Sequence, residues 1–337
     1  MSERQALVEA ENLAKHFPIR RGVLRRTVGT VRAVDGVSFT VRRGETLGLV
    51  GESGSGKSTI GRVLLRLTEP TSGSVRFRGR DITALDQRPL RELRPRLQMV
   101  FQDSYSSLTP RLPVGAAVRE PLDLNGVGTA AGRRTRVEEL FDLVHLDRRL
   151  MDRLPHELSG GQRQRVGIAR ALACDPEFIV ADEAIAALDV SIQAQIVNLL
   201  LDLQQELALT YLFITHDLAM ARHVCDRIAV LYLGRVVEVG DAERVTAHPR
   251  HPYTRALLSA VPVADPVREA TRRRVILRGE IPSPADPPPG CRFSTRCPYA
   301  TRICRESEPE LLHGEHGGEV ACHHAGRLDS PPTPADA

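Results

Sequence analysis

The chain lacks the features that would place it in a membrane or in a secretory pathway. Its 337 residues contain no run of about eighteen apolar residues, the length that a membrane-spanning helix needs. Residues 1–5 carry no apolar core of a secretory signal. We therefore expect a cytosolic protein whose contacts with a membrane come through partners.

A large excess of one charge is also missing. The 46 lysines and arginines nearly balance the 42 aspartates and glutamates, which leaves a net charge of +4. This is too weak and too evenly spread to predict nucleic-acid binding. Lysine is scarce, with only Lys15 and Lys57 in a chain that otherwise uses arginine. The length allows about two domains, and a hydrophobic content of 42% is ordinary for a soluble core.

What the sequence does contain is a phosphate-binding loop. Residues 51–59 fit the pattern G-x-x-x-x-G-K-[ST], between a predicted buried strand and a predicted helix at 60–67. Glycines let the backbone approach a polyphosphate, and the N–H groups of the loop and helix start attract its charge. Lys57 would reach the terminal phosphates and Ser58 the magnesium ion; an ordinary glycine-rich turn is the alternative. The predicted loop residues are Gly51, Glu52, Ser53, Gly54, Ser55, Gly56, Lys57, Ser58 and Thr59.

Alternation of strands and helices predicts an α/β fold with a parallel sheet covered on both faces. The predicted strands are 46–50, 74–78, 98–101, 178–181 and 211–214, with an amphipathic helix at 190–206, a mostly helical stretch at 103–172 and a closing hairpin at 227–239. We interpret the basic segment 20–26 as a solvated loop insertion. Prolines between 282 and 289 indicate a stiff linker before a segment that contains four cysteines.

Polar residues follow three of the predicted strands. Asp182 could hold magnesium through water, and Glu183 could polarise an attacking water, although two acids at a strand end are often simply solvated. His216 could contact the γ-phosphate, or it could cap a helix. Gln102 could ligate the metal or position the water.

A second helix start with exposed N–H groups is predicted at the residues Leu158, Ser159, Gly160, Gly161 and Gln162, which precede a helix at 163–173. A hydroxyl and two glycines at a helix start can bind an anion. Taken alone, the segment is more typical of a serine N-cap followed by a glycine turn than of an anion-binding site.

Together, these residues resemble the ATP-binding subunit of ABC transporters over about residues 7–262. The resemblance implies a RecA-like P-loop ATPase core with an antiparallel β-subdomain at its start and a helical subdomain at about 103–172. It implies Mg²⁺ held by Ser58, Gln102 and Asp182, and catalysis by Glu183, His216 and Gln102. Two subunits would pair head to tail, so that residues 158–162 act on the partner's ATP and Asp189 lies in the interface loop. Phe17 would stack on adenine, with simple packing as the alternative.

The closer resemblance is to importers of oligopeptides, dipeptides and, in some members, nickel. It rests on residues 101–111, 189–195, 251–257 and 290–298. It implies an ATP-hydrolysing subunit at the cytoplasmic face of the membrane, with two transmembrane permease subunits, an extracytoplasmic solute-binding protein and a second, related ATP-binding subunit. Import of nickel or another small solute, a non-transport ATPase and a redox-sensing metal module are the alternatives.

Two residues depart from that subgroup, which usually has proline and serine where this chain has Ala184 and Ala186. The missing hydroxyl at 186 removes a hydrogen-bonding group from the implied dimer interface, where a typical hydrogen bond is worth about 0.5–1.5 kcal/mol. We expect slower or less tightly coupled hydrolysis, not its absence.

Four cysteines cluster in the C-terminal extension at 263–337, at Cys291, Cys297, Cys304 and Cys322. Disulfides are not expected in a reducing compartment. The spacings match neither the C-x-x-C pair of common zinc sites nor the run found in ferredoxins, so they leave the metal open. The resemblance implies a four-iron four-sulfur cluster. The alternatives are zinc, with His313, His316, His323 and His324 available for a mixed site, and no metal at all. Cys174 and Cys225 are predicted to be small core residues.

Overall fold

The protein is described by a computed structural model that covers residues 5–22, 26–103, 107–186, 188–261, 275–313, 318–326 and 328. The chain divides into two compact units. The first unit comprises Met1–Val8, Val41–Thr46 and Phe77–Ile214, and the second comprises Glu9–Thr40, Leu47–Arg76 and Thr215–Ala337. Within the described residues, no helix is both long enough and apolar enough to span a membrane.

The first unit is built on strands in the order β8-β7-β6, and these strands are parallel, as the sequence predicts. Their bounds are β6 Leu97–Val100, β7 Phe178–Asp182 and β8 Thr210–Thr215. Every residue of β7 and β8 is buried, which explains why these strands are continuous apolar runs. The amphipathic helix α7 (Val190–Leu207) joins them and buries Ile196, Leu199 and Leu203.

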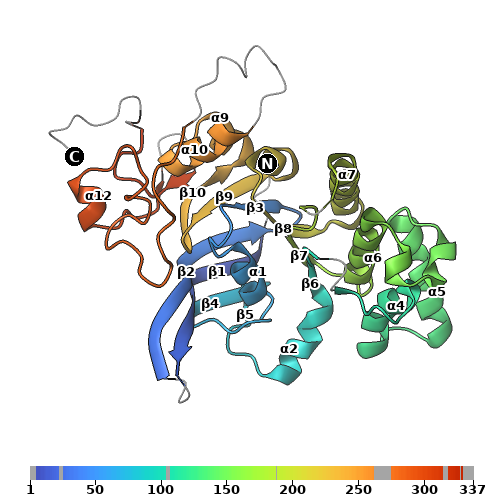
Figure 1. Ribbon diagram of the computed structural model, residues 1–337. Coiled ribbons are helices and arrows are strands. Elements are labelled where there is room, and N and C mark those ends of the chain that lie inside the picture. The colour runs from blue at the N-terminus through green and yellow to red at the C-terminus, as the bar shows by residue number, and fades with distance from the viewer. Residues whose placement is uncertain are drawn as a thin grey trace, which may run out of the picture. The chain divides into compact units, whose positions relative to one another are not determined.

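Helices make up most of the described residues between 107 and 172, as predicted. In Figure 1, α4 (Val114–Leu124), α5 (Ala130–Leu143) and α6 (Gly160–Leu172) form one cluster, and the three pack against one another. Two 3-10 turns, η2 (Arg148–Asp152) and η3 (Pro155–Glu157), lead into α6. The other elements among the described residues of this unit are β5 (Arg80–Asp81), α2 (Gln87–Leu93) and η1 (Arg94–Arg96).

The first sheet of the second unit corrects the interpretation of the segment 20–26. Instead of short strands and a loop insertion, the chain forms two long strands, β1 (Ala6–Arg21) and β2 (Arg26–Arg42), followed in the sheet by β4 (Ser72–Phe77). Arg20, Arg21 and Arg26 are exposed on these strands. Charged side chains such as arginine are compatible with the part of an edge strand that extends beyond the core. Residues 23–25 lie outside the described part of the chain.

The second sheet of this unit has the order β11-β12-β10-β9-β3. Its strands are β3 Thr46–Val50, β9 Arg227–Tyr232, β10 Arg235–Asp241, β11 Leu312–His313 and β12 Glu319–Val320. β3 and β9 are parallel, and β9 and β10 form the predicted antiparallel hairpin. The sequence did not indicate that β12 of the C-terminal extension would pair with β10.

Five helices belong to the second unit within the described residues: α1 Lys57–Leu64, α8 Leu218–Val224, α9 Ala242–Ala247, α10 Pro252–Ala260 and α12 Arg302–Glu306. Helix α1 begins three residues before the predicted start, because Gly56 adopts a left-handed conformation directly ahead of it and acts as its N-cap. It ends at Leu64 and not at residue 67, since the backbone of Arg66 has a positive φ.

Candidate functional site

The phosphate loop lies in the second unit, between the fully buried strand β3 and helix α1. Two of its glycines are required by the packing of the backbone. A Cβ atom on Gly51 would lie 2.2 Å from the carbonyl oxygen of Leu231, and one on Gly56 would lie 2.1 Å from that of Ala33. Gly56 also has a φ of +105°. The loop therefore fits a narrow space that only glycine allows at these two positions.

Lys57 is folded into this loop. Its side chain is 5% exposed, and its Nζ donates hydrogen bonds to the carbonyl oxygens of Gly51 at 2.7 Å and Glu52 at 2.9 Å. The ammonium thus lies against the loop backbone at the N-terminus of α1, where the helix dipole also provides positive potential. This is an arrangement suited to a polyphosphate.

Glu52 has partners that the sequence reasoning missed. Its N–H donates to the hydroxyl of Tyr253 at 2.8 Å, and its carboxylate accepts two hydrogen bonds from Arg296 at 2.8 and 3.1 Å. Both partners come from segments that carried the resemblance, 251–257 and 290–298. The resemblance therefore pointed to these two segments, but it did not indicate that Tyr253 and Arg296 would bind Glu52.

The carboxylates at the end of β7 lie in the first unit. Asp182 is 3% exposed, whereas Glu183 is partly exposed and has a φ of +44°, a conformation that is rare for residues other than glycine. Its N–H donates to the carbonyl oxygen of Ile214 at 3.0 Å. The Nε2 of Gln102 donates to its carboxylate at 2.9 Å. The structure therefore brings together two predicted catalytic residues, Gln102 and Glu183, from the ends of neighbouring strands.

The start of α6 is a capping box, also in the first unit. The hydroxyl of Ser159 accepts from the N–H of Gln162 at 3.2 Å, and the side chain of Gln162 accepts from the N–H of Ser159 at 2.9 Å. A Cβ atom on Gly161 would lie 2.7 Å from a methyl group of Ile192 in α7. The N-cap interpretation is confirmed. A capping box of this kind is compatible with binding an anion at the same helix start, which stays a prediction. Leu158 is buried just before the box, and Asp189 is the N-cap residue of α7.

Two further predicted residues belong to the second unit. The helix-capping alternative for His216 is wrong, because Asp217 is the N-cap of α8 and accepts from the N–H groups of Ala219 and Met220. Phe17 is 41% exposed on β1, with the Lys15 ammonium 5.1 Å from the centre of its ring. The ring is exposed, and its stacking on adenine stays a prediction.

The cysteines do not form a metal centre in the structure. Within the described residues, no group of three or more histidine, cysteine or acidic side chains is arranged to hold a metal ion, so neither the iron–sulfur cluster nor zinc is supported. The four cysteines form no disulfides. Burial, more than the charge of other cysteines, raises the pKa of Cys291 to about 11 and of Cys297 to about 12.

The histidines that could have joined the cysteines have other partners. His324 bonds to Thr301 at 2.9 Å, His323 to the carbonyl oxygen of Ser307 at 3.1 Å, and His313 to Glu319 at 3.1 Å, while His316 lies outside the described residues. Of the other two cysteines, Cys225 is buried as predicted. Cys174 is only partly buried.

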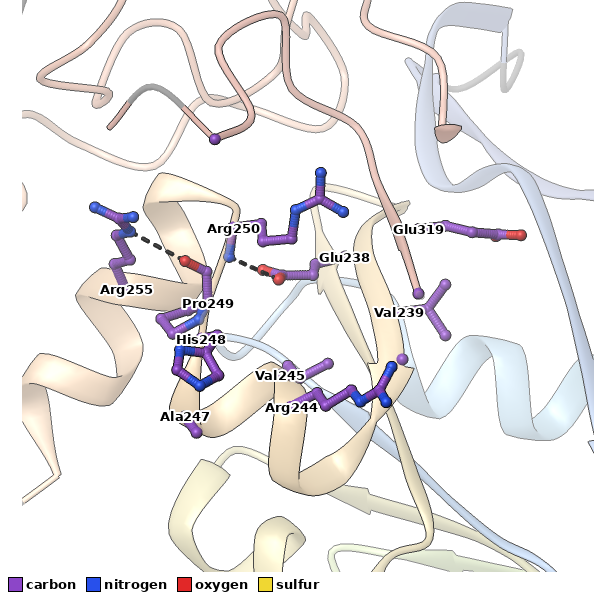
Figure 2. Close-up of a pocket in the computed structure, with 13 residues that line it drawn as sticks. Glu238, Val239, Arg244, Val245, Ala247, His248, Pro249, Arg250, Arg255 and Glu319 are labelled. Atoms are coloured by element: carbon purple, nitrogen blue, oxygen red, sulfur yellow. Dashed lines mark hydrogen bonds between the residues drawn. The ribbon is translucent and has the colours of Figure 1, made fainter. Parts of the chain in front are cut away.

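A cavity of about 950 Å³ also lies in the second unit, beside β10 and α9, and Figure 2 shows the side chains around it. Glu238 is 3% exposed there and accepts the N–H of Arg250 at 2.8 Å and that of His251 at 3.0 Å. Burial raises the pKa of this carboxyl, despite the hydrogen bonds that oppose it. The lining mixes acidic side chains with arginines and includes no residue of the predicted ATP site.

Comparisons with known proteins agree with these local features. A family model described as ABC transporter matches residues 34–186, and one described as oligopeptide/dipeptide transporter, C-terminal region, matches residues 237–304. The oligopeptide transport ATP-binding protein AppF of Bacillus subtilis (strain 168) is 50% identical over 323 residues, which are 96% of this chain and 98% of that protein.

Two solved structures resemble the chain at lower identity. One is the ATP-binding cassette MJ0796 in a dimeric post-hydrolysis state bound to ADP and phosphate, with 33% identity and a TM-score of 0.63 over 70% of this chain and 99% of that one. The other is cbiO1 from Clostridium perfringens, part of the ABC transporter complex cbiONQ, with 28% identity and a TM-score of 0.63 over 72% and 92%.

Proposed function

Because the chain belongs to the ABC transporter family of ATP-binding proteins, we propose that it is the ATP-hydrolysing subunit of an importer of short peptides. The observation that carries the proposal is the likeness to AppF over nearly the whole of both chains, including the C-terminal region described for oligopeptide and dipeptide transporters. The enclosed phosphate loop with its inward lysine supports ATP as the nucleotide.

In the proposed mechanism, the loop residues 51–59 hold the phosphates of ATP, with Lys57 and the start of α1 balancing their charge. Oxygen donors are the ligands that Mg²⁺ prefers, and Ser58, Gln102 and Asp182 would supply them. The bound ion would supply further neutralisation of the phosphate charge. Gln102 donates through its Nε2 to Glu183, so its Oε1 would be the oxygen that it supplies as a ligand.

Glu183 is proposed as the general base. A carboxylate that takes a proton from water must be held in place, and the hydrogen bond from Gln102 and the tethered N–H of Glu183 do this. The strained backbone at Glu183 supports the same role, because such conformations persist at sites where orientation matters. His216 would contact the γ-phosphate, and Phe17 would stack on the adenine.

We also propose that two ATP-binding subunits pair head to tail. The capping box at residues 158–162 would then act on the ATP of the partner, and Asp189 would lie at the interface. Closing of this pair on ATP and reopening after hydrolysis would drive two transmembrane permease subunits, which receive peptide from an extracytoplasmic binding protein. The chain would be peripheral, at the cytoplasmic face, and its pairing partner a related but different subunit.

Reconstitution tests this function. The chain is purified with its permease subunits in proteoliposomes, and ATP hydrolysis is measured with and without a peptide-loaded binding protein. We expect stimulation by peptide and its loss in Lys57→Ala. Stimulation by nickel and not by peptide, or failure of any integral membrane subunit to copurify with the chain, would contradict the proposal.

We propose that the four cysteines of the C-terminal extension bind a metal, either as an iron–sulfur cluster or as zinc. Four thiols suit either, and the N–H of Cys291 donates to the carbonyl oxygen of Cys304 at 2.8 Å, which brings the backbones of two of the four cysteines together. Metal analysis and visible absorbance of anaerobically purified protein distinguish the two. Equal amounts of iron and labile sulfide support the cluster, and a folded chain without any metal contradicts the proposal.

A further inference from the structure

The segment that carries the cysteines also reaches the phosphate loop. Arg296 directly precedes Cys297, and its guanidinium binds both carboxylate oxygens of Glu52, at 2.8 and 3.1 Å. The Arg296 side chain is 8% exposed and that of Glu52 27%, so the pair lies largely out of water. A two-pronged contact between arginine and carboxylate fixes orientation as well as distance. Arg296 therefore holds the side chain of a loop residue in one direction.

The backbone of Glu52 is held from a second direction. Its N–H donates to the hydroxyl of Tyr253, whose ring is completely buried. The rings of Tyr232 and Phe293 pack against that of Tyr253, with centres 4.7 and 5.4 Å away. Because Phe293 belongs to the cysteine-bearing segment, the position of the tyrosine hydroxyl also depends on that segment.

A third contact reaches the other side of the loop. Arg292, which follows Cys291, donates to the carbonyl oxygen of Leu233 and to the carboxylate of Asp35. The neighbouring Gly234 donates its N–H to the carbonyl oxygen of Ser55 at 2.8 Å. Arg292 thus supports the turn that holds Ser55 in the phosphate loop.

The loop residues held by these contacts also position the lysine of the phosphate loop. The Nζ of Lys57 donates to the carbonyl oxygens of Gly51 and Glu52, so the position of the ammonium follows the conformation of those two residues. From this geometry, and resting on the proposed function, we infer that Arg296 is a positioning residue for ATP binding: through Glu52, it sets the conformation of the phosphate loop. The C-terminal extension is then a structural part of the nucleotide site.

Binding of a fluorescent ATP analogue with a mant group to the full-length chain tests the inference. Arg296→Ala should weaken binding about tenfold, since a charged hydrogen-bonded contact of this kind is worth roughly that factor or more. Arg302→Ala is the matched control, because this arginine lies in the same extension but is 85% exposed on α12. Its affinity should stay within about twofold of the wild type.

Kinetics separate positioning from a general loss of structure. In the assembled transporter, Arg296→Ala should raise KM for ATP while kcat changes by less than about threefold, because the proposed base is untouched. Arg296→Lys should recover part of the affinity through its single ammonium. In a double-mutant cycle, Arg296→Ala should add little to the effect of Glu52→Gln.

Wild-type affinity and KM in a folded Arg296→Ala chain would overturn the inference. Should that variant not fold, Glu52→Gln carries the test, because it keeps the shape of the side chain and removes the charge, and wild-type affinity in it would be equally decisive. A wild-type chain that binds no ATP, or a Lys57→Ala chain that binds it normally, would instead contradict the proposed function.

Discussion

Replacing Gly56 by alanine tests the phosphate loop most sharply. The residue has a φ of +105°, and a Cβ there would lie 2.1 Å from the backbone oxygen of Ala33. The left-handed conformation alone costs a residue with a side chain about 1–2 kcal/mol. The overlap adds to this cost, because the obstructing atom belongs to backbone and cannot rotate away, so we expect a total of at least about 3 kcal/mol.

Gly79→Ala is the matched control. Gly79 also has a positive φ, of +75°, but beyond its chain neighbours no heavy atom of the described residues lies within 4 Å of the place that a methyl group would take. This variant should bear only the conformational cost, lower Tm by a few degrees and leave ATP binding unchanged.

Thermal unfolding followed by circular dichroism, together with binding of mant-ATP, measures both effects. Gly56→Ala should either unfold at a much lower temperature or shift the loop and lose ATP binding. The reasoning is refuted if Gly56→Ala matches Gly79→Ala in Tm and the wild type in affinity, because the close approach to Ala33 would then carry no cost.

Two further predictions concern carboxylates of the first unit. Glu183→Gln should lower ATP hydrolysis by about 10²–10⁴-fold while ATP binding is kept, and turnover at the wild-type rate would show that another group is the base. Glu177 accepts hydrogen bonds from Arg43, Arg78 and Arg96; although burial raises its pKa, these bonds outweigh burial and lower it. A carboxyl with a lowered folded-state pKa stabilises the fold above its unfolded pKa of about 4.3 and loses that contribution as the pH falls. Glu177→Gln should therefore cost roughly 1–3 kcal/mol at pH 7, and the difference from wild type in urea unfolding should shrink below about pH 4; a difference independent of pH would contradict this.

The parts of the fold that could be predicted are those set by neighbouring residues. The strands around β7 and β8 are continuous apolar runs, and the loop at 51–59 has a spacing that few other structures require. The long strands β1 and β2 were missed, because exposed arginines at their ends hide the alternation that marks a strand.

The contacts that complete the candidate site could not be predicted. Glu52 meets Tyr253 and Arg296 across 201 and 244 residues of sequence, and no local pattern encodes such a pairing. The backbone strain at Glu183 was equally hidden, since a positive φ at a glutamate is imposed by its surroundings and not by its own preferences. The pairing of Gln102 with Glu183 was closer to reach, because both follow neighbouring parallel strands.

The short strand β12 has a consequence for how this protein can be shortened. Its residues Glu319 and Val320 pair with Val239 and Glu238 of β10, and the N–H of Ala321 donates to the carbonyl oxygen of Val237 at 2.9 Å. A chain truncated before the cysteines would leave the edge of β10 with unpaired N–H and C=O groups, which can pair with a strand from another molecule. Removing the C-terminal extension would therefore favour self-association of the protein, because β12 of the extension covers this edge of β10.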